Sequence, residues 1–162
     1  MRNFPTFSRP TLSMLAVKVL EKYKHYTMID IKQIYYDLGK AMTGVCDRLY
    51  KRSRPKTIER KVDSYLVVDV PYVIKNNELD GCGSYNDYTT TIQLVVYVRD
   101  KVSSSNANEF NLTSMDAKVK AVLSRFPIST DYMTVSNPRV MLQSDDGDGF
   151  GVTVIQGRLR TK

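Results

Sequence analysis

The apolar residues of this chain change their spacing once, near residue 64, and that change restricts the folds open to it. Before it they recur at every third or fourth position, in 11–23 and again in 31–49, which is typical of amphipathic helices. After it they recur at every second position, which is typical of strands with one buried face. We therefore expect two helices before residue 55 and a sheet after it.

Two long strands are expected at 64–75 and 88–101, paired antiparallel across the loop at 76–87. Pro71 has no N–H to donate, so the first strand should lie at an edge or carry a bulge there. A third helix is expected at 115–126. The expected N-caps are Asp30 or Thr27 for the second helix and Thr113 or Ser114 for the third.

The second helical pattern contains Gly39 and Gly44, each of which weakens a helix by ~1 kcal/mol relative to alanine, so the helix should kink or break there. Pro127 should end the third helix. The closing strands are expected at 131–135, 139–143 and 149–160. Together these elements predict an α+β fold, with helices packed on one face of an antiparallel sheet of about four strands.

The chain of 162 residues, 42% hydrophobic and 25% charged, has the profile of a single globular domain over 1–162, with 1–10 as an extended arm. Cys46 and Cys82 lie far apart and form no C-x-x-C pair, so both are expected as unbridged thiols. No apolar run has the length of a secretory signal or of a membrane span. We expect a soluble protein made in the cytoplasm, with no membrane partner.

Positive charge is concentrated in the first part of the chain. Residues 1–62 contain 14 basic and 5 acidic side chains, whereas residues 63–162 contain 10 and 12. The excess is densest in the basic connecting segment 48–61, which can contact DNA or an acidic protein surface, or can be a solvated linker. Its cations are Arg48, Lys51, Arg52, Arg54, Lys56, Arg60 and Lys61.

The side chains that most enzymes use are scarce. His25 is the only histidine and has no neighbouring nucleophile or carboxylate, so it is interpreted as a cation at a helix C-terminus. The run 145–149 resembles a calcium loop but lacks the twelfth-position glutamate and the flanking helices, which favours a hairpin turn. A metal-dependent nuclease would have to draw on Asp69, Asp80, Asp87 and Asp100. We expect no catalytic residue, metal or cofactor.

Aromatic side chains favour contact with other proteins, since the chain has 11 tyrosines and no tryptophan. Phe4 and Phe7 in the arm need an apolar surface to cover them. The residues expected at an interface are Phe4, Phe7, Tyr72 and Tyr97.

The order of these elements resembles that of the tail terminator and tail-completion proteins of tailed bacteriophages. The segments that carry the resemblance are the central strands 64–75 and 88–101, the helix at 111–126 and the final strand 149–160. The second helix and segment 48–61 are longer than expected for that family, so a different connector layer of the neck is also compatible with the sequence.

The resemblance implies a structural subunit of the virion, assembled in the host cytoplasm, that forms a homo-oligomeric ring between the portal or neck and the tail. Such a ring would contact neighbouring neck, portal or tail proteins and DNA in its channel. It would have no enzymatic activity. The alternative is a small basic DNA- or RNA-binding module that uses segment 48–61.

Overall fold

The computed structural model describes residues 30–70, 74–79, 85–102, 108–142 and 145–161. Along the chain, the described elements are α2 (Ile31–Ala41), β1 (Arg48–Lys51), β2 (Ser64–Asp69), β3 (Ile74–Leu79), β4 (Tyr85–Arg99), β5 (Lys101–Val102), β6 (Asn108–Glu109), α3 (Leu112–Leu123), β7 (Ile128–Ser129), β8 (Met133–Leu142) and β9 (Phe150–Thr161). Several predictions concern residues outside the described ranges: the arm 1–10 with Phe4 and Phe7, the helix at 11–23, and Thr27, His25, Pro71, Tyr72, Asp80 and Cys82.

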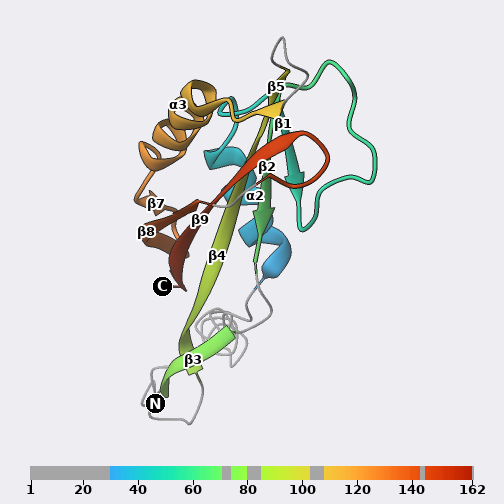
Figure 1. The fold of residues 1–162 in the computed structure, drawn as a ribbon. Helices are drawn as coiled ribbons and strands as arrows, with labels where there is room; N and C mark the ends of the chain where they lie inside the picture. Colours follow the sequence, from blue (N-terminus) through green and yellow to red (C-terminus); the bar gives the residue numbers. More distant parts are fainter. Residues whose placement is uncertain (1–29, 71–73, 80–84, 103–107, 143–144, 162) are drawn as a thin grey trace, which may run out of the picture.

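One mixed sheet dominates the described part of the chain, and it curls into half of a barrel (Figure 1). Its order is β1-β2-β4-β9-β8-β7, and β3 pairs with β4 off this path. The prediction of an α+β fold, with about four antiparallel strands and helices packed on one face, is therefore wrong. The sheet has seven strands in the described residues, β1 runs parallel to β2, and only two short helices are described there.

The second helix is shorter than its apolar pattern. Asp30 is its N-cap, as predicted, and its carboxylate accepts a hydrogen bond from the Gln33 N–H at 3.1 Å. The helix ends at Ala41, and two residues beyond its C-cap Gly44 adopts φ +80°, which glycine tolerates best. The chain then turns into β1, so the predicted helix over 31–49 covers a helix, a turn and the start of a strand.

Strand β4 is the centre of the sheet. It pairs with β9 along 89–99, and on its other side it pairs first with β3 and then with β2. The predicted antiparallel pair of long strands is confirmed for β2 and β4, with Val67 opposite Val95. The strand predicted at 64–75 ends at Asp69, and β3 pairs with β4 beyond it. The β3–β4 pair lies at one end of the sheet (Figure 1).

The main core lies between one face of the sheet and the two helices. Leu38 of α2 and Val122 of α3 are fully buried there, together with Leu66, Leu94 and Ile155 of the central strands. The N-caps predicted for the third helix, Thr113 or Ser114, lie two or three positions too late, and the helix ends at Leu123. Its N-cap is Asn111, whose side chain accepts from the Ser114 N–H at 3.4 Å, in place of the predicted caps.

A second, smaller core lies on the opposite face of the sheet. Tyr65 and Tyr97 stack there, with ring centroids 4.3 Å apart and planes 9° from parallel. Phe150 meets Tyr65 edge-on at 5.2 Å, and Ile58 of the segment between β1 and β2 packs against this group. Apolar residues therefore occupy both faces of the central strands.

Candidate functional site

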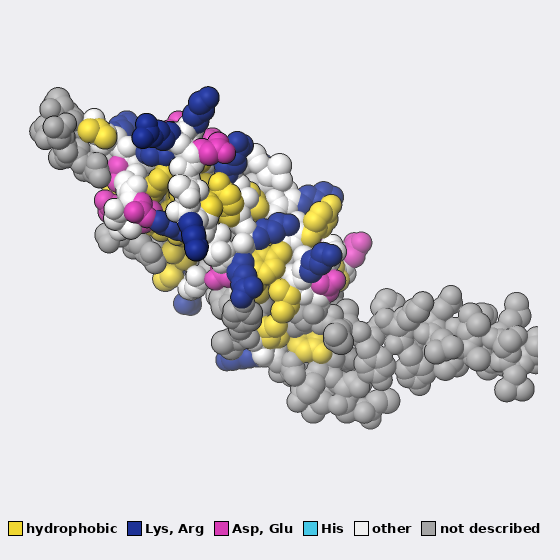
Figure 2. Space-filling view, turned by 90° about the vertical axis from the view of Figure 1, so that its right-hand side faces the viewer, with side chains coloured by type: hydrophobic (Ala, Val, Ile, Leu, Met, Phe, Trp, Pro, Cys, Tyr) yellow, Lys and Arg dark blue, Asp and Glu magenta, His cyan; other side chains and the backbone are white. Residues whose placement is uncertain are grey.

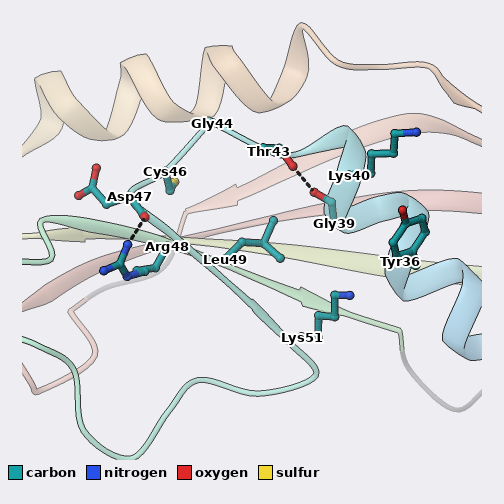
Figure 3. Close-up of a pocket in the computed structure, with 10 residues that line it drawn as sticks. All are labelled: Tyr36, Gly39, Lys40, Thr43, Gly44, Cys46, Asp47, Arg48, Leu49 and Lys51. Atoms are coloured by element: carbon teal, nitrogen blue, oxygen red, sulfur yellow. Dashed lines mark hydrogen bonds between the residues drawn. The ribbon is translucent and has the colours of Figure 1, made fainter.

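The described residues contain a basic pocket of about 450 Å³ between α2 and β1 (Figure 3). Helix α2 contributes Tyr36, Gly39 and Lys40 to it, and β1 contributes three residues, two of them cationic. The ten lining residues are Tyr36, Gly39, Lys40, Thr43, Gly44, Cys46, Asp47, Arg48, Leu49 and Lys51. Cations therefore outnumber carboxylates in the lining by three to one.

Gly39 gives Lys51 access to the pocket. A Cβ atom at residue 39 would lie 3.3 Å from Cε of Lys51, which is tighter than an ordinary contact. With glycine there, the Lys51 stem passes over the helix and its Nζ lies 5.8 Å from the centroid of the Tyr36 ring (Figure 3). A cation within about 6 Å of an aromatic face is attracted to it. Tyr36 is 56% exposed, so its ring remains accessible from solvent.

The one carboxylate among the lining residues, that of Asp47, is already hydrogen-bonded to backbone N–H groups. Asp47 Oδ2 accepts hydrogen bonds from the Asp63 N–H at 3.1 Å and the Ser64 N–H at 2.9 Å. Burial by itself would raise the pKa of this carboxyl, but the hydrogen bonds outweigh it and the pKa lies below its ordinary value. Asp47 thus remains ionised while it holds the start of β2 against the turn that precedes β1.

The thiol of Cys46 lines the pocket and is free in the described residues. Burial raises its pKa to about 11, and Lys118 opposes this only partly. Since the thiolate is the reactive form, this cysteine is a poor nucleophile near neutral pH.

The structure separates the seven cations of segment 48–61 into different roles. Arg54 donates to the Asp146 and Asp148 carboxylates, so it stabilises the fold and does not offer its charge to a ligand. Arg48 lies 3.9 Å from Glu59 in a pair whose two side chains are both largely exposed. The other exposed cations of this segment are Lys51, Arg52, Lys56, Arg60 and Lys61. On the face that carries β1, Lys and Arg side chains are spread along the molecule with hydrophobic side chains between them (Figure 2).

The carboxylates considered for a nuclease are not gathered into one site in the described residues. Asp69 accepts a hydrogen bond from the Tyr35 hydroxyl at 3.4 Å, and Asp87 pairs with Arg160 at 2.6 Å. Asp100 follows β4, where burial and then the charge of Asp145 raise the pKa of its carboxyl. No group of three metal-ligating side chains occurs among the described residues.

The hairpin turn predicted at 145–149 is confirmed, because it joins the antiparallel strands β8 and β9. Gly147 and Gly149 adopt φ of +80° and +83°, and the Asp146 side chain accepts from the N–H groups of Asp148 and Phe150. The acidic side chains of this run thus hold the turn itself and Arg54.

The sheet has open edges in the described part of the chain. Strand β7 pairs with only the first residues of β8, and no described strand pairs with the outer edge of 136–142 or with that of β3. Val140 and Met141 are 43% and 40% exposed on β8. Tyr97, predicted at an interface, is half-buried and stacks on Tyr65 within the subunit.

Sequence reasoning missed Tyr36, Lys40 and the open edge of β8. Lys40 belongs to α2, outside the basic segment, and approaches β1 only through the turn at Gly44. Val140 and Met141 alternate like any strand residues, so their spacing carries no signal that the edge beside them is open.

No described helix is long and apolar enough to cross a membrane. No protein-family model and no curated protein sequence matches this chain.

Proposed function

We propose that this chain is a structural subunit that joins copies of itself into a closed ring, and that the ring belongs to the neck or tail of a bacteriophage particle. The observation that carries the proposal is that two of the open edges of the described sheet, one on β8 and one on β3, can pair with each other. The outer edges of β8 and β3 lie on opposite sides of β4 in the strand order. Strand β8 is regular over 139–142, beyond a register shift between Ser136 and Arg139, and β3 covers 74–79.

Open edges expose backbone N–H and C=O groups that can pair with a strand of another chain. A contact between two different edges is heterologous, so each copy retains one free edge after binding. If the rotation between neighbours divides a full turn, such a contact closes into a ring. Pairing the β8 edge of one copy with the β3 edge of the next gives this kind of repeat.

Exposed apolar residues support the choice of β8. Val140 and Met141 are neighbours in a strand, so they lie on opposite faces of the sheet, and both are partly exposed. A strand added beside β8 would cover the Val140 and Met141 side chains on the two faces of the sheet. It would also form hydrogen bonds with the backbone N–H and C=O groups of the β8 edge. Burial of apolar surface contributes about 25 cal/mol per Å², which favours association at this edge.

The proposal that the ring belongs to a virion is supported by the part of the predicted order of elements that the structure retains. A helix precedes the long antiparallel pair of β2 and β4, another helix follows that pair, and β9 closes the sheet. The separated carboxylates and the poorly reactive Cys46 also favour a structural role over catalysis.

Native mass spectrometry and negative-stain electron microscopy of the purified chain test the ring. The expected result is one discrete oligomer that appears as a ring. The double variant Val140→Lys/Met141→Lys should shift this oligomer to single subunits with an unchanged circular dichroism spectrum, because it replaces two apolar side chains of the proposed contact with charged ones that would have to be desolvated on pairing.

The matched control is Leu112→Lys, which changes an apolar residue that is 68% exposed at the start of α3. This variant should assemble like the natural chain. A chain that remains a single subunit at every concentration contradicts the ring. Assembly that resists the β8 double variant assigns the contact to another surface. Absence of the chain from purified phage particles, with ring formation intact, contradicts the virion and leaves the ring.

A further inference from the structure

We propose that the pocket between α2 and β1 binds a phosphate of a single-stranded nucleic acid and that Tyr36 stacks on the adjoining base. This inference goes beyond the ring, because the pocket is formed within one chain and lies apart from the β8 edge. It rests on the combination of two lysines without an ion pair in the described residues, an exposed aromatic ring and a defined concave site.

The cations of the pocket have little competition for an anion. Neither Lys40 nor Lys51 forms an ion pair with a carboxylate in the described residues, and Arg48 has only the loose pair with Glu59. Asp47, the one acidic side chain of the lining, is hydrogen-bonded to backbone N–H groups. A phosphate therefore meets a net positive site without having to displace a strong internal pair.

The C-terminus of α2 lies at the pocket, and the negative end of a helix dipole opposes an anion. Here its last carbonyls are already hydrogen-bonded. The Met42 N–H donates to Leu38, the Thr43 hydroxyl donates to Gly39 at 3.1 Å, and the Thr43 N–H donates to Lys40. Lys40 in the last turn offsets the dipole further. Lys40 and Lys51 therefore supply the charge that an anion would meet at this end of the helix.

Tyr36 favours a nucleic acid over an acidic peptide. A base can stack on an exposed aromatic ring while its phosphate contacts neighbouring cations, which is the combination that single-strand-binding proteins use. Tyr36 is largely exposed and Lys51 lies over its ring, so the stacking surface and a phosphate contact are adjacent. In a duplex each base is stacked between its neighbours and has no free face to offer, so a single strand should bind better than a duplex.

The remaining exposed cations of segment 48–61 extend the positive surface next to β1. These cations attract any polyanion at long range. This attraction weakens as salt is added, and it does not depend on where each cation lies. The pocket differs from them because its cations surround a volume of about 450 Å³, within the range of small-ligand sites. A test must therefore separate the pocket from the general charge.

Fluorescence anisotropy with a labelled single-stranded oligothymidylate makes this separation on the full chain. The pocket variant Lys40→Gln/Lys51→Gln and the control Lys56→Gln/Lys61→Gln remove the same charge from exposed positions. The pocket variant should lose about tenfold or more in affinity and lower the slope of log affinity against log salt by about 0.7, for the one phosphate bound in the pocket. The control should lose less than about threefold.

Tyr36→Ala should weaken binding about tenfold, whereas Tyr36→Phe retains the ring and should bind like the natural chain. Equal losses in the two lysine double variants would mean binding by general charge and overturn the pocket. Equal binding of Tyr36→Ala and the natural chain overturns the stacking. If polyglutamate of matched charge competes as well as the oligonucleotide, the site recognises acidic protein and the proposal is wrong. These outcomes are independent of ring formation, which the Val140→Lys/Met141→Lys variant reports separately.

Discussion

Arg54 donates a hydrogen bond to the Asp146 carboxylate at 2.6 Å and thereby joins segments that lie 92 positions apart in the chain. The same guanidinium also reaches Asp148. The contact ties the segment between β1 and β2 to the β8–β9 turn, next to the stacked pair of Tyr65 and Tyr97. Arg54 thus holds the segment between β1 and β2, whose Ile58 packs against the smaller core, next to the β8–β9 turn.

Arg54→Ala should lower the free energy of unfolding by about 1–3 kcal/mol, because the Asp146 side chain is only 7% exposed and would lose its cation. Urea unfolding measures this loss, which should shrink at high salt. Lys56→Ala removes a cation from an exposed position of the same segment and should change the free energy little. A loss no larger than that of the control would mean that the contact does not hold the segment.

Thr153→Val should raise the free energy of unfolding by about 1 kcal/mol. Thr153 of β9 is fully buried, and its hydroxyl has no hydrogen-bond partner in the described residues. Valine has nearly the same shape and no group to desolvate. The control is Thr161→Val, also buried, because the Thr161 hydroxyl accepts from the Tyr88 N–H at 2.8 Å and its loss should destabilise the fold. Thermal unfolding compares the two, and a loss in both variants contradicts the account of Thr153.

The parts of the fold that follow local rules could be predicted from the sequence. The Asp30 cap, the turn at Gly147 and Gly149, and the antiparallel pair of β2 and β4 depend on residues close in sequence or on plain alternation. Strand β1 could not, because Leu49 continues the apolar spacing of α2 and the parallel partner of the strand begins only at Ser64. A glycine that permits either a kink or a turn does not indicate which of the two occurs.

The candidate site depended on tertiary contacts that the sequence does not show. The basic segment was evident from its charge, but its division into a structural Arg54 and an available Lys51 follows from the positions of Asp146 and Gly39. The sheet was predicted too small because β1 was taken for the end of the helix at 31–49 and part of the basic segment, β3 was divided between the strand at 64–75 and the loop at 76–87, and β7 has only two residues.

Gly157→Ala should destabilise the fold by about 1–3 kcal/mol, the usual cost of overpacking a core. A Cβ atom at this position of β9 would lie 2.8 Å from Val135 Cγ1 and 3.0 Å from Phe126 Cε1. The Val135 side chain has few favourable χ1 rotamers, so rotating its Cγ1 atom away from the new Cβ atom costs free energy. Val135→Ala in the same chain should recover part of the loss, and a double-mutant cycle measures that coupling. If the losses in free energy of unfolding from Gly157→Ala and Val135→Ala are additive, the side chains at these two positions do not clash.

Asp100→Asn should stabilise the protein near neutral pH. Burial, followed by the charge of Asp145, raises the pKa of the Asp100 carboxyl above its ordinary value, and its Oδ1 atom is buried without a hydrogen-bond partner in the described residues. Between the unfolded and folded pKa values the folded state binds more protons, so the stability of the natural chain falls as pH rises through this window. Asparagine does not titrate, so the difference in Tm should grow from about pH 4 to pH 7 in favour of the variant. Asp131→Asn makes the same charge change at an exposed position, and if its Tm profile matches that of Asp100→Asn, net charge alone accounts for the effect.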